Sequence, residues 1–498
     1  MHSDSQTIQQ QTGMEPNMKR WRLKPPSTEE ILNGHALTTM AKIGGPSVIS
    51  ALLFTLYNLA DAFWIGRLPS EQAGAVMAGI QISWPFVWLL ISFVAGFGGA
   101  AVSALVAQYI GAGRHKEANF ALNQLVTISL AASIILGIAG YLATSSIVSV
   151  LVSDAAVALE AATYLKVIFL GLCTMLVPGL FSFAFSATGD TVTPLFVNGT
   201  GILLNLVLDP FLVLGWGPFP QMGILGAAYA TVAAQGVASV IFLVMFVKGR
   251  RALRLDRHAL VPKRAWLSKA LKIGIPAAVG QSTVALGFVV LMWVIGRLPN
   301  AEAALAGYGI ADRIFGILFI VTDGLSVGLT TMIGQALGAK RLDRARELVR
   351  KGLGALLVIL VVEAAVLWLL RTPLVAMFIP GREDVIHEGK RFIELFAVGM
   401  PFLGAFFAAQ AVYRGSGHNV PTMILGILRV WVLRIPLSYA LAFIVGLQAD
   451  GVWWGMSASN VIAGLAAVGF LVSHRWQRAV IDHDEVGRIP QPEPAALE

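Results

Sequence analysis

Apolar stretches long enough to span a lipid bilayer recur along almost the whole chain, and they limit its possible folds more than any other feature. A membrane-spanning helix needs about 20 predominantly apolar residues. Of the 498 residues, 56% are hydrophobic and 13% are charged, whereas soluble domains carry roughly 25% charged residues. The sequence therefore predicts an all-α integral membrane protein with twelve transmembrane helices. The apolar stretches are 40–66, 73–111, 119–143, 156–188, 192–214, 224–247, 271–297, 302–338, 349–370, 386–413, 421–446 and 451–473.

Basic residues predict the topology, because loops rich in lysine and arginine stay on the cytoplasmic side. If 73–111 forms a single helix, the basic residues within 19–24, 248–269 and 340–351 all fall on one side of the membrane. Both termini are then cytoplasmic, and we expect a multi-pass protein of the plasma (inner) membrane. These loops account for the net charge of +8, so no nucleic-acid partner is expected.

The two halves of the chain repeat each other. The segment Ile-Gly-Arg-Leu-Pro at 65–69 recurs at 295–299, and the pattern Gln-x-x-Gly-Ala at 108–112 recurs at 335–339. Each half holds six predicted helices, an even number, so the halves share one topology. We therefore expect two six-helix bundles related by a pseudo-two-fold axis along the membrane normal. Such bundles facing a central cleft are a recurring plan of secondary transporters.

The expected domain organisation follows from this repeat and from the polar ends of the chain. One cysteine, Cys173, excludes an intrachain disulfide and a cysteine-based metal site, and no cofactor is expected. The predicted parts are a disordered cytoplasmic tail (1–35), an N-lobe with helices 1–6 (36–247), a basic cytoplasmic linker (248–270), a C-lobe with helices 7–12 (271–474) and a second cytoplasmic tail (475–498).

Two aspartates lie deep inside predicted spans, where an ionisable group is costly and therefore marks a functional site. Asp61 ends the pattern Tyr57-Asn58-x-x-Asp61 in the first helix, and residues three and four apart share a helix face. Asn205 and Asp209 share a face of the fifth helix in the same way. We therefore expect Tyr57 and Asn58 to point into a cavity together with Asp61.

The chemistry of these residues fits a bound cation or a carried proton. Pro210, which follows Asp209, removes a backbone donor and frees carbonyl oxygens beside the carboxylate. Oxygen ligands suit a hard cation such as Na⁺, so Asp61, Asn205 and Asp209 could hold one. Two desolvated carboxylates can equally carry protons, and the choice stays open.

The repeat strengthens the functional interpretation, because the scaffold is duplicated and the acids are not. The counterparts of Asp61 and Asp209 are Leu291 and Ile435. The sequence does not assign the roles of three other acids of the predicted spans. Asp323 is a second candidate for the cavity lining, while Asp312 adjoins an arginine and Glu363 lies in the ninth helix.

Several motifs then occur in the order that one known family shows, across residues 35–473. In this combination the chain resembles the multidrug and toxic compound extrusion (MATE) transporters, in their archaeal-like, DNA-damage-inducible branch. The motifs are Pro46…Tyr57-x-x-x-Asp61…Gly66, the two Gln-x-x-Gly-Ala patterns, Asn205-x-x-x-Asp209-Pro210, Gly226-Ala-Ala-Tyr-Ala-Thr231 and Arg414-Gly-x-Gly417.

The resemblance implies export of organic, often cationic, drugs or toxic compounds by alternating access in exchange for H⁺ or Na⁺. It implies that the coupling site of the N-lobe comprises Asp61, Asn205, Asp209 and Thr231. Another branch uses acids of the seventh and tenth helices, and this chain has none at those positions: 276–297 holds no acid, and 408–411 reads Ala-Ala-Gln-Ala.

Two other functions were weighed against this antiporter. A flippase for a lipid-linked saccharide would have a similar cleft, but it needs basic residues in the cavity to hold a pyrophosphate, whereas the N-lobe helices carry acids. An enzymatic function in the membrane is disfavoured, because the eight histidines of the chain are dispersed and the sequence has no paired acidic motif or nucleophile elbow. The expected partners are small organic substrates, H⁺ or Na⁺ and the lipid bilayer, and the protein is expected to be a monomer.

Overall fold

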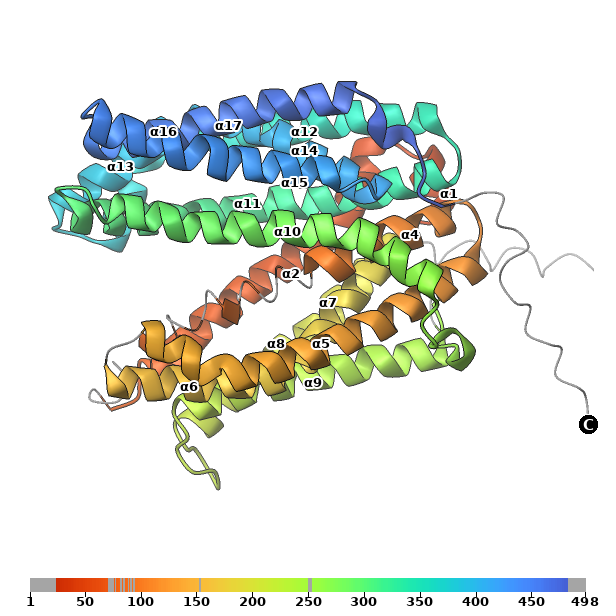
Figure 1. The fold of residues 1–498 in the computed structure, drawn as a ribbon, viewed down its shortest axis with the longest axis horizontal. Coiled ribbons are helices and arrows are strands. Elements are labelled where there is room, and N and C mark those ends of the chain that lie inside the picture. Colours follow the sequence, from red (N-terminus) through yellow and green to blue (C-terminus); the bar gives the residue numbers. More distant parts are fainter. Residues whose placement is uncertain are drawn as a thin grey trace, which may run out of the picture.

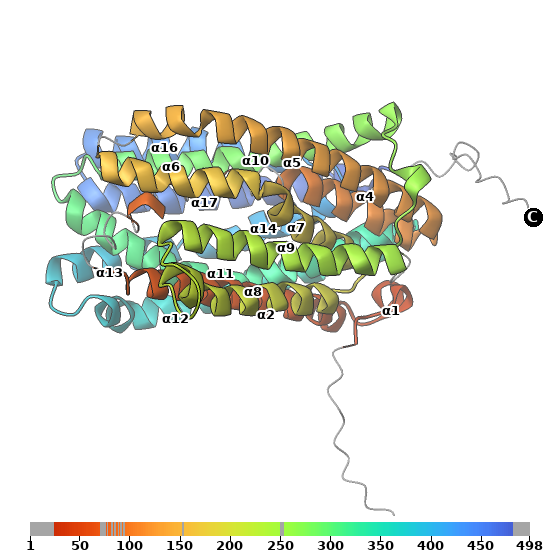
Figure 2. The ribbon, with the colours of Figure 1, turned by 90° about the horizontal axis from the view of Figure 1, so that it is seen from below.

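The structure is a computed structural model, and it describes residues 24–69, 95–151, 154–249 and 253–481 with scattered positions between 76 and 92. The chain is built of helices that run side by side along the long axis of the molecule (Figure 1; Figure 2). The helices of the first half are α1 (Thr28–Asn33), α2 (Ala36–Ile65), the π-helical segment η1 (Ala95–Gly99), α4 (Ala100–Gly111), α5 (His115–Leu151), α6 (Ala155–Leu170), α7 (Leu172–Ala187), α8 (Val192–Val213) and α9 (Ile224–Lys248).

The second half follows the short helix η2 (Arg257–Ala259). Its elements are α10 (Arg264–Ile295), α11 (Ala301–Gly338), α12 (Leu342–Phe378), α13 (Glu383–Ala397), α14 (Met400–Ser416), α15 (Val420–Ile427), the π-helical segments η3 (Leu428–Arg434) and η4 (Ala440–Ile444) flanking α16 (Ile435–Tyr439), α17 (Gln448–Val472) and η5 (Arg475–Gln477).

The described helices account for the predicted membrane spans. Nine of them are long and apolar enough to cross a bilayer. The pairs α6–α7 and α13–α14 add one span each, with bends of 54° and 60° between their members. The remaining span ends in η1 and α4, and its beginning falls within residues 70–94, of which only some are described. The predicted fold of twelve transmembrane helices in two six-helix bundles is confirmed.

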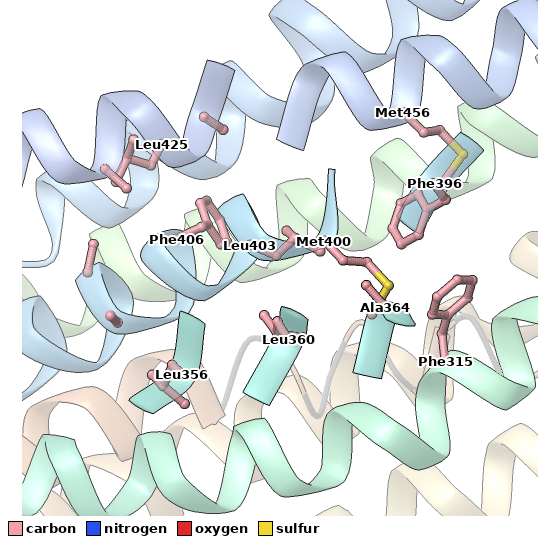
Figure 3. Close-up of a cluster of buried hydrophobic side chains, with 14 of the residues drawn as sticks. Phe315, Leu356, Leu360, Ala364, Phe396, Met400, Leu403, Phe406, Leu425 and Met456 are labelled. Atoms are coloured by element: carbon pink, nitrogen blue, oxygen red, sulfur yellow. The ribbon is translucent and has the colours of Figure 1, made fainter. Parts of the chain in front are cut away.

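Each bundle has its own packed interior. In the second bundle, side chains from α11 to α17 interlock, among them Phe315, Leu360, Met400 and Met456 (Figure 3). Lipid is as apolar as these side chains, so close van der Waals packing rather than the hydrophobic effect holds the helices together. Large apolar residues on the outer faces, such as Leu369, are exposed and suit contact with lipid.

The two bundles touch through two equivalent helix crossings. At the crossing of α2 and α11, a Cβ on Gly44 would lie 2.8 Å from the carbonyl oxygen of Gly324. At the crossing of η1 and α10, a Cβ on Gly274 would lie 2.7 Å from the carbonyl oxygen of Phe97. Glycine permits such a close approach of backbones. Gly44 and Gly274 are counterparts in the repeat, so the duplicated sequence builds both crossings.

The repeated Gln-x-x-Gly-Ala patterns join the bundles at one end of the molecule. Gln108 at the end of α4 donates to the carbonyl oxygens of Gly415 and Ser416, each at 3.1 Å. Its counterpart Gln335 at the end of α11 donates to the carbonyl oxygen of Ala187 at 2.9 Å. Each glutamine thus reaches across to the other bundle. We call this pair of contacts the glutamine clasp; it comprises Gln108, Gly111, Gln335, Gly338 and the carbonyl groups that they meet.

The tails and the linker are more ordered than the sequence predicted. Residues 28–33 of the expected disordered tail form α1, where Ile31 is fully buried and Arg344 donates to its carbonyl oxygen at 3.1 Å. In the other tail, Trp476 is buried and the amide of Val480 donates to the Gln108 side chain at 2.9 Å. Apolar side chains within these polar segments anchor them to the bundles. The polar overall composition of the tails did not predict this anchoring.

The linker also differs from the prediction. Its helix α10 begins at Arg264, inside the expected linker of 248–270. The segment that precedes α10 packs on α5 through Gln124. The Gln124 side chain donates to the carbonyl oxygen of Val261 at 2.7 Å and accepts from the backbone amide of Lys263 at 2.8 Å.

Candidate functional site

The structure brings the predicted acids of two helices together. Helix α2 packs against α8, and the carboxyl group of Asp61 on α2 forms a side-chain hydrogen bond with that of Asp209 on α8. Asp209 and Asn205, one turn apart on α8, are each only 1% exposed. Two carboxyl groups in direct contact must share a proton or a cation, because both cannot remain charged at this distance without one.

The amide of Asn205 completes this pair of acids. Its oxygen and nitrogen are assigned from their hydrogen-bond partners. With its nitrogen facing the acids, it donates to Asp61 Oδ1 at 3.0 Å and to Asp209 Oδ2 at 3.2 Å. Its oxygen then accepts from the backbone amide of Thr231 on α9 at 3.3 Å. The four residues named for the predicted coupling site therefore form one cluster, which we call the acid cluster: Asp61, Asn205, Asp209 and Thr231.

Tyr57 connects the acid cluster to open space. Its hydroxyl lies 3.0 Å from Thr231 Oγ1 and is close enough to Asp61 for the charge of that carboxyl group to act on it. Tyr57 and Thr231 line a cavity of about 470 Å³ inside the first bundle, which we call the N-lobe cavity. Tyr164 on α6 lines the same cavity, close enough to Asp61 and Asp209 for their charges to act on its hydroxyl.

The remaining lining of the N-lobe cavity is largely apolar and aromatic. Phe54 and Phe183 contribute rings, and Asn198 and Gln235 contribute side-chain amides. Apolar pockets of 300 to about 1,000 Å³ with few polar groups are typical of small-molecule sites. The N-lobe cavity has these properties, and its polar wall is the edge of the acid cluster.

A second cavity, of about 590 Å³, lies against the other bundle, and we call it the C-lobe cavity. Its lining carries charges: Asp323 on α11, Arg414 on α14 and Arg429 on η3. Phe183 and Val327 line both cavities, so the two spaces adjoin.

The other acids and amides that the sequence singled out have separate places. Asn58 does not join the acid cluster, because its amide donates to the carbonyl oxygen of Phe54 on its own helix at 2.8 Å, and it lines neither cavity. The expectation that it points into the cavity is wrong. Asp323 lies in the C-lobe cavity, away from the acid cluster. Asp312 accepts from the Tyr308 hydroxyl at 3.4 Å, and Glu363 is buried on α12.

Sequence reasoning missed two lining residues. Tyr164 sits on a helix whose pattern gave no signal, and only its packing against the first bundle places it beside the acids. Arg414 was noted solely as part of a motif, although it lines the C-lobe cavity. Arg414 lies one residue beyond the predicted span 386–413, so the rule that a charge inside a span marks a functional site did not point to it.

The acid cluster offers oxygen ligands of a kind that suits a monovalent cation. Within the described part of the chain, no three His, Cys, Asp or Glu side chains come together as they would around a divalent metal. The oxygen groups present are the two carboxyl groups and the hydroxyls of Tyr57 and Thr231, while the Asn205 amide presents its nitrogen to the acids.

Comparison with known families gives a match in each half. The MatE family model matches residues 46–211 and again residues 276–440. The chain belongs to the MatE family. The two matches begin 230 residues apart, which is the spacing of the repeat found in the sequence, and the resemblance to the MATE transporters is confirmed. A protein of this family is a membrane transporter.

Similar proteins cover nearly the whole MatE chain. A probable multidrug resistance protein NorM of Thermotoga maritima is 27% identical over 457 residues, covering 90% of this chain and 95% of the relative. An FAD transporter of Shewanella oneidensis is 26% identical over 423 residues, covering 84% and 91%. Among solved structures, a MATE crystallised in complex with MaL6 matches with a TM-score of 0.82 at 22% identity, covering 90% of this chain and 98% of that one.

Proposed function

We propose that this MatE protein is a secondary active antiporter that exports organic drugs or toxic compounds in exchange for H⁺ or Na⁺. The observation that carries the proposal is the acid cluster, which lies beside an apolar cavity large enough for a small organic molecule. The cluster would hold the coupling ion, and the adjoining cavities would hold the substrate.

Tyr57 and Thr231 supply the physical link between ion and substrate. They contact the acid cluster on one side and line the N-lobe cavity on the other. A change in the protonation or occupancy of Asp61 and Asp209 would alter their hydrogen bonds and hence the cavity wall. Coupling then requires the ion to bind the two access states with different affinities.

The topology and assembly belong to this proposal as well. We place both termini and the linker on the cytoplasmic side of the inner membrane, because the basic segments gather there. The proposed boundaries are an N-lobe of 36–247 and a C-lobe of 271–474, and the working unit is a monomer. The N-lobe position of the acids favours the archaeal-like, DNA-damage-inducible branch.

The decisive experiment is transport of a rhodamine cation in proteoliposomes under separately imposed H⁺ and Na⁺ gradients. Wild type is compared with Asp61→Asn and Asp209→Asn. We expect one gradient to drive efflux and each substitution to abolish it, since an amide cannot carry the charge. Asp154→Asn is the matched control, because Asp154 is an exposed cap of α6 that accepts from two backbone amides.

Three results would count against the proposal. Efflux by both variants at the wild-type rate would remove the acid cluster from the mechanism. Efflux that needs neither gradient would exclude antiport. Absence of any rhodamine movement by folded wild-type protein would favour the flippase for a lipid-linked saccharide.

A further inference from the structure

We propose that the C-lobe cavity is a subsite for an anionic group of the transported compound, a carboxylate or a phosphate, with Arg429 as its main ligand and Arg414 as the second. The preferred substrates are then soluble amphiphilic zwitterions or anions rather than simple cations. This inference rests on the proposed export of organic compounds and names the class of substrate.

Arg429 is a buried cation without an anion. It lines the C-lobe cavity, is 8% exposed, and its Nε has no hydrogen-bond partner. Its guanidinium lies over the Phe406 ring, with 4.5 Å between Cζ and the ring centroid. Among the described residues, the charged group that acts on it is another cation, Arg434. A buried charge without a counterion is costly, so the site is complete only with an anion in the cavity.

Arg434 shows how a structural arginine on the same segment differs. It is 2% exposed, donates to Ser459 Oγ at 3.2 Å and to Asn460 Oδ1 at 2.6 Å, and is acted on by the charge of Asp312. It does not line either cavity. Among the described residues, Arg434, which faces packed helices, is therefore hydrogen-bonded, whereas the Arg429 side chain, which faces the cavity, has neither a hydrogen bond nor a carboxylate partner.

The backbone around Arg429 is also unusual. Residues 428–434 form the π-helical segment η3, in a span that also contains a second π-helical segment, η4. Such turns are rare and occur mostly at functional sites, since they change the direction of the side chains that follow. The local geometry thus gives Arg429 and Arg434 their different environments.

The second arginine of the cavity is only partly balanced. The Arg414 side chain makes no ion pair or hydrogen bond within the described part of the chain, although the charge of Asp323 acts on it. The charge of Asp323 also acts on Glu363 of α12, which does not line the cavity. Between residues 70 and 94, where only some positions are described, the sequence has one charged residue, Glu71.

The position of the cavity specifies the rest of the ligand. The C-lobe cavity adjoins the apolar N-lobe cavity through Phe183 and Val327. One molecule could place an aromatic body against Phe54 and Phe183 while its anionic group reaches Arg429. A charge-assisted hydrogen bond to guanidinium favours carboxylate and phosphate through their matching geometry.

Two dyes that differ in one charge test this assignment. Rhodamine B carries a free carboxylate on a cationic xanthene ring, and its ethyl ester lacks that carboxylate. Binding of each to the full-length protein in phosphatidylcholine nanodiscs is measured by fluorescence anisotropy. We expect wild type to bind rhodamine B more tightly than the ester, and Arg429→Gln to weaken rhodamine B binding by about tenfold or more while changing ester binding little.

Further variants keep the test independent of folding. Arg429→Lys should retain part of the preference for rhodamine B, and Arg414→Gln should reduce it. Arg297→Gln is the control, because Arg297 is exposed, lies outside both cavities and stacks on Trp293. Size-exclusion profiles report whether each variant folds.

The outcomes separate this inference from the proposed function. Equal or tighter binding of the ester by wild type, or equal losses for both dyes in Arg429→Gln, overturns the anion subsite, whereas gradient-driven efflux of the ester would still support antiport. A preference that disappears when phosphatidic acid is added to the discs would assign the site to a lipid headgroup and overturn the soluble substrate. Rhodamine B selectivity without any gradient-driven transport would leave a binding site and contradict the antiporter.

Discussion

At the scale of single residues, the acid cluster depends on a short chain of hydrogen bonds that ends at the cavity. The hydroxyls of Thr231 and Tyr57 form a hydrogen bond of 3.0 Å, and the backbone amide of Thr231 donates to the side-chain oxygen of Asn205 at 3.3 Å. Asn205 in turn meets both carboxyl groups. If the acid cluster holds the coupling ion, as we propose, the loss of one hydroxyl should weaken ion binding without removing it.

Tyr57→Phe should reduce the apparent affinity for the coupling ion by about threefold to tenfold, the range expected for one lost hydrogen bond. Thr231→Val should act similarly, and Thr231→Ser should remain close to wild type. The double variant Tyr57→Phe/Thr231→Val should lose less than the sum of the two, because the side chains share a bond. The measurement is the dependence of rhodamine efflux on ion concentration; additive losses would contradict a direct link.

The sequence predicted part of this site and could not predict the rest. Helical spacing placed Tyr57 on one face with Asp61, and Asn205 with Asp209. Spacing within a helix does not show which helices are neighbours. The prediction that α2, α8 and α9 contact each other therefore depended on the family resemblance. Asn58 shows the same limit, because its amide is satisfied by its own backbone. Tyr164 and Arg414 depend on packing between distant segments, for which the sequence had no local signal.

At the scale of helices, the glutamine clasp depends on glycines that let two helix ends meet. A Cβ on Gly111 would lie 2.0 Å from the carbonyl oxygen of Gln335, and one on Gly338 would lie 1.9 Å from that of Gln108. No side chain fits at these distances while the clasp is closed. The repeated Gln-x-x-Gly-Ala pattern was visible in the sequence as a sign of duplication, but its role in joining the bundles emerged only from the structure.

Gly338→Ala and Gly111→Ala should each open the clasp. Overpacking costs about 1–3 kcal/mol, which corresponds to a shift in the conformational equilibrium of about fivefold to more than a hundredfold. We expect faster hydrogen–deuterium exchange in residues 103–112 and 330–338. Gly354→Ala is the matched control, because a Cβ there meets nothing within 4 Å. Unchanged exchange in both clasp variants, in folded protein, would show that the glycines do not hold the clasp closed.

The predicted helices differ from the observed ones mainly at their ends and bends. Hydrophobicity placed the spans, because only the apolar part of a helix must match the bilayer. Helix α10 nonetheless extends back to Arg264, and α12 runs from Leu342 to Phe378, beyond both ends of the predicted span 349–370. The 60° bend between α13 and α14 falls at Val398–Gly399, just before Pro401 at the start of α14. Proline lacks a backbone N–H and favours such a break, but the size of the bend depends on packing between helices.

At the scale of the whole molecule, the two bundles are joined at the end that holds the glutamine clasp. The N-lobe and C-lobe cavities lie between the clasp and the opposite end of the molecule. The clasp contacts include Gln108, Gln335 and the carbonyl groups of Ala187 and Gly415. In Figure 1 the bundles converge toward α1 and α4 and diverge toward α6 and α13. If the clasp side is cytoplasmic, as we propose, this arrangement corresponds to access from the outer side of the membrane.

Cysteine labelling can test that orientation. Cys173 is the only cysteine of the chain, so a Cys173→Ser background leaves an introduced thiol as the sole target. Ser326→Cys places it in the C-lobe cavity on α11. A membrane-impermeant methanethiosulfonate should label this thiol in right-side-out vesicles and react slowly in inverted ones. Adding Gly338→Ala should raise labelling in inverted vesicles and lower it in right-side-out ones, because an alternating-access protein that opens one side closes the other. Equal labelling from both sides with the clasp intact would mean that the clasp does not separate the cavity from the cytoplasm, and rapid labelling only in inverted vesicles would reverse the proposed topology.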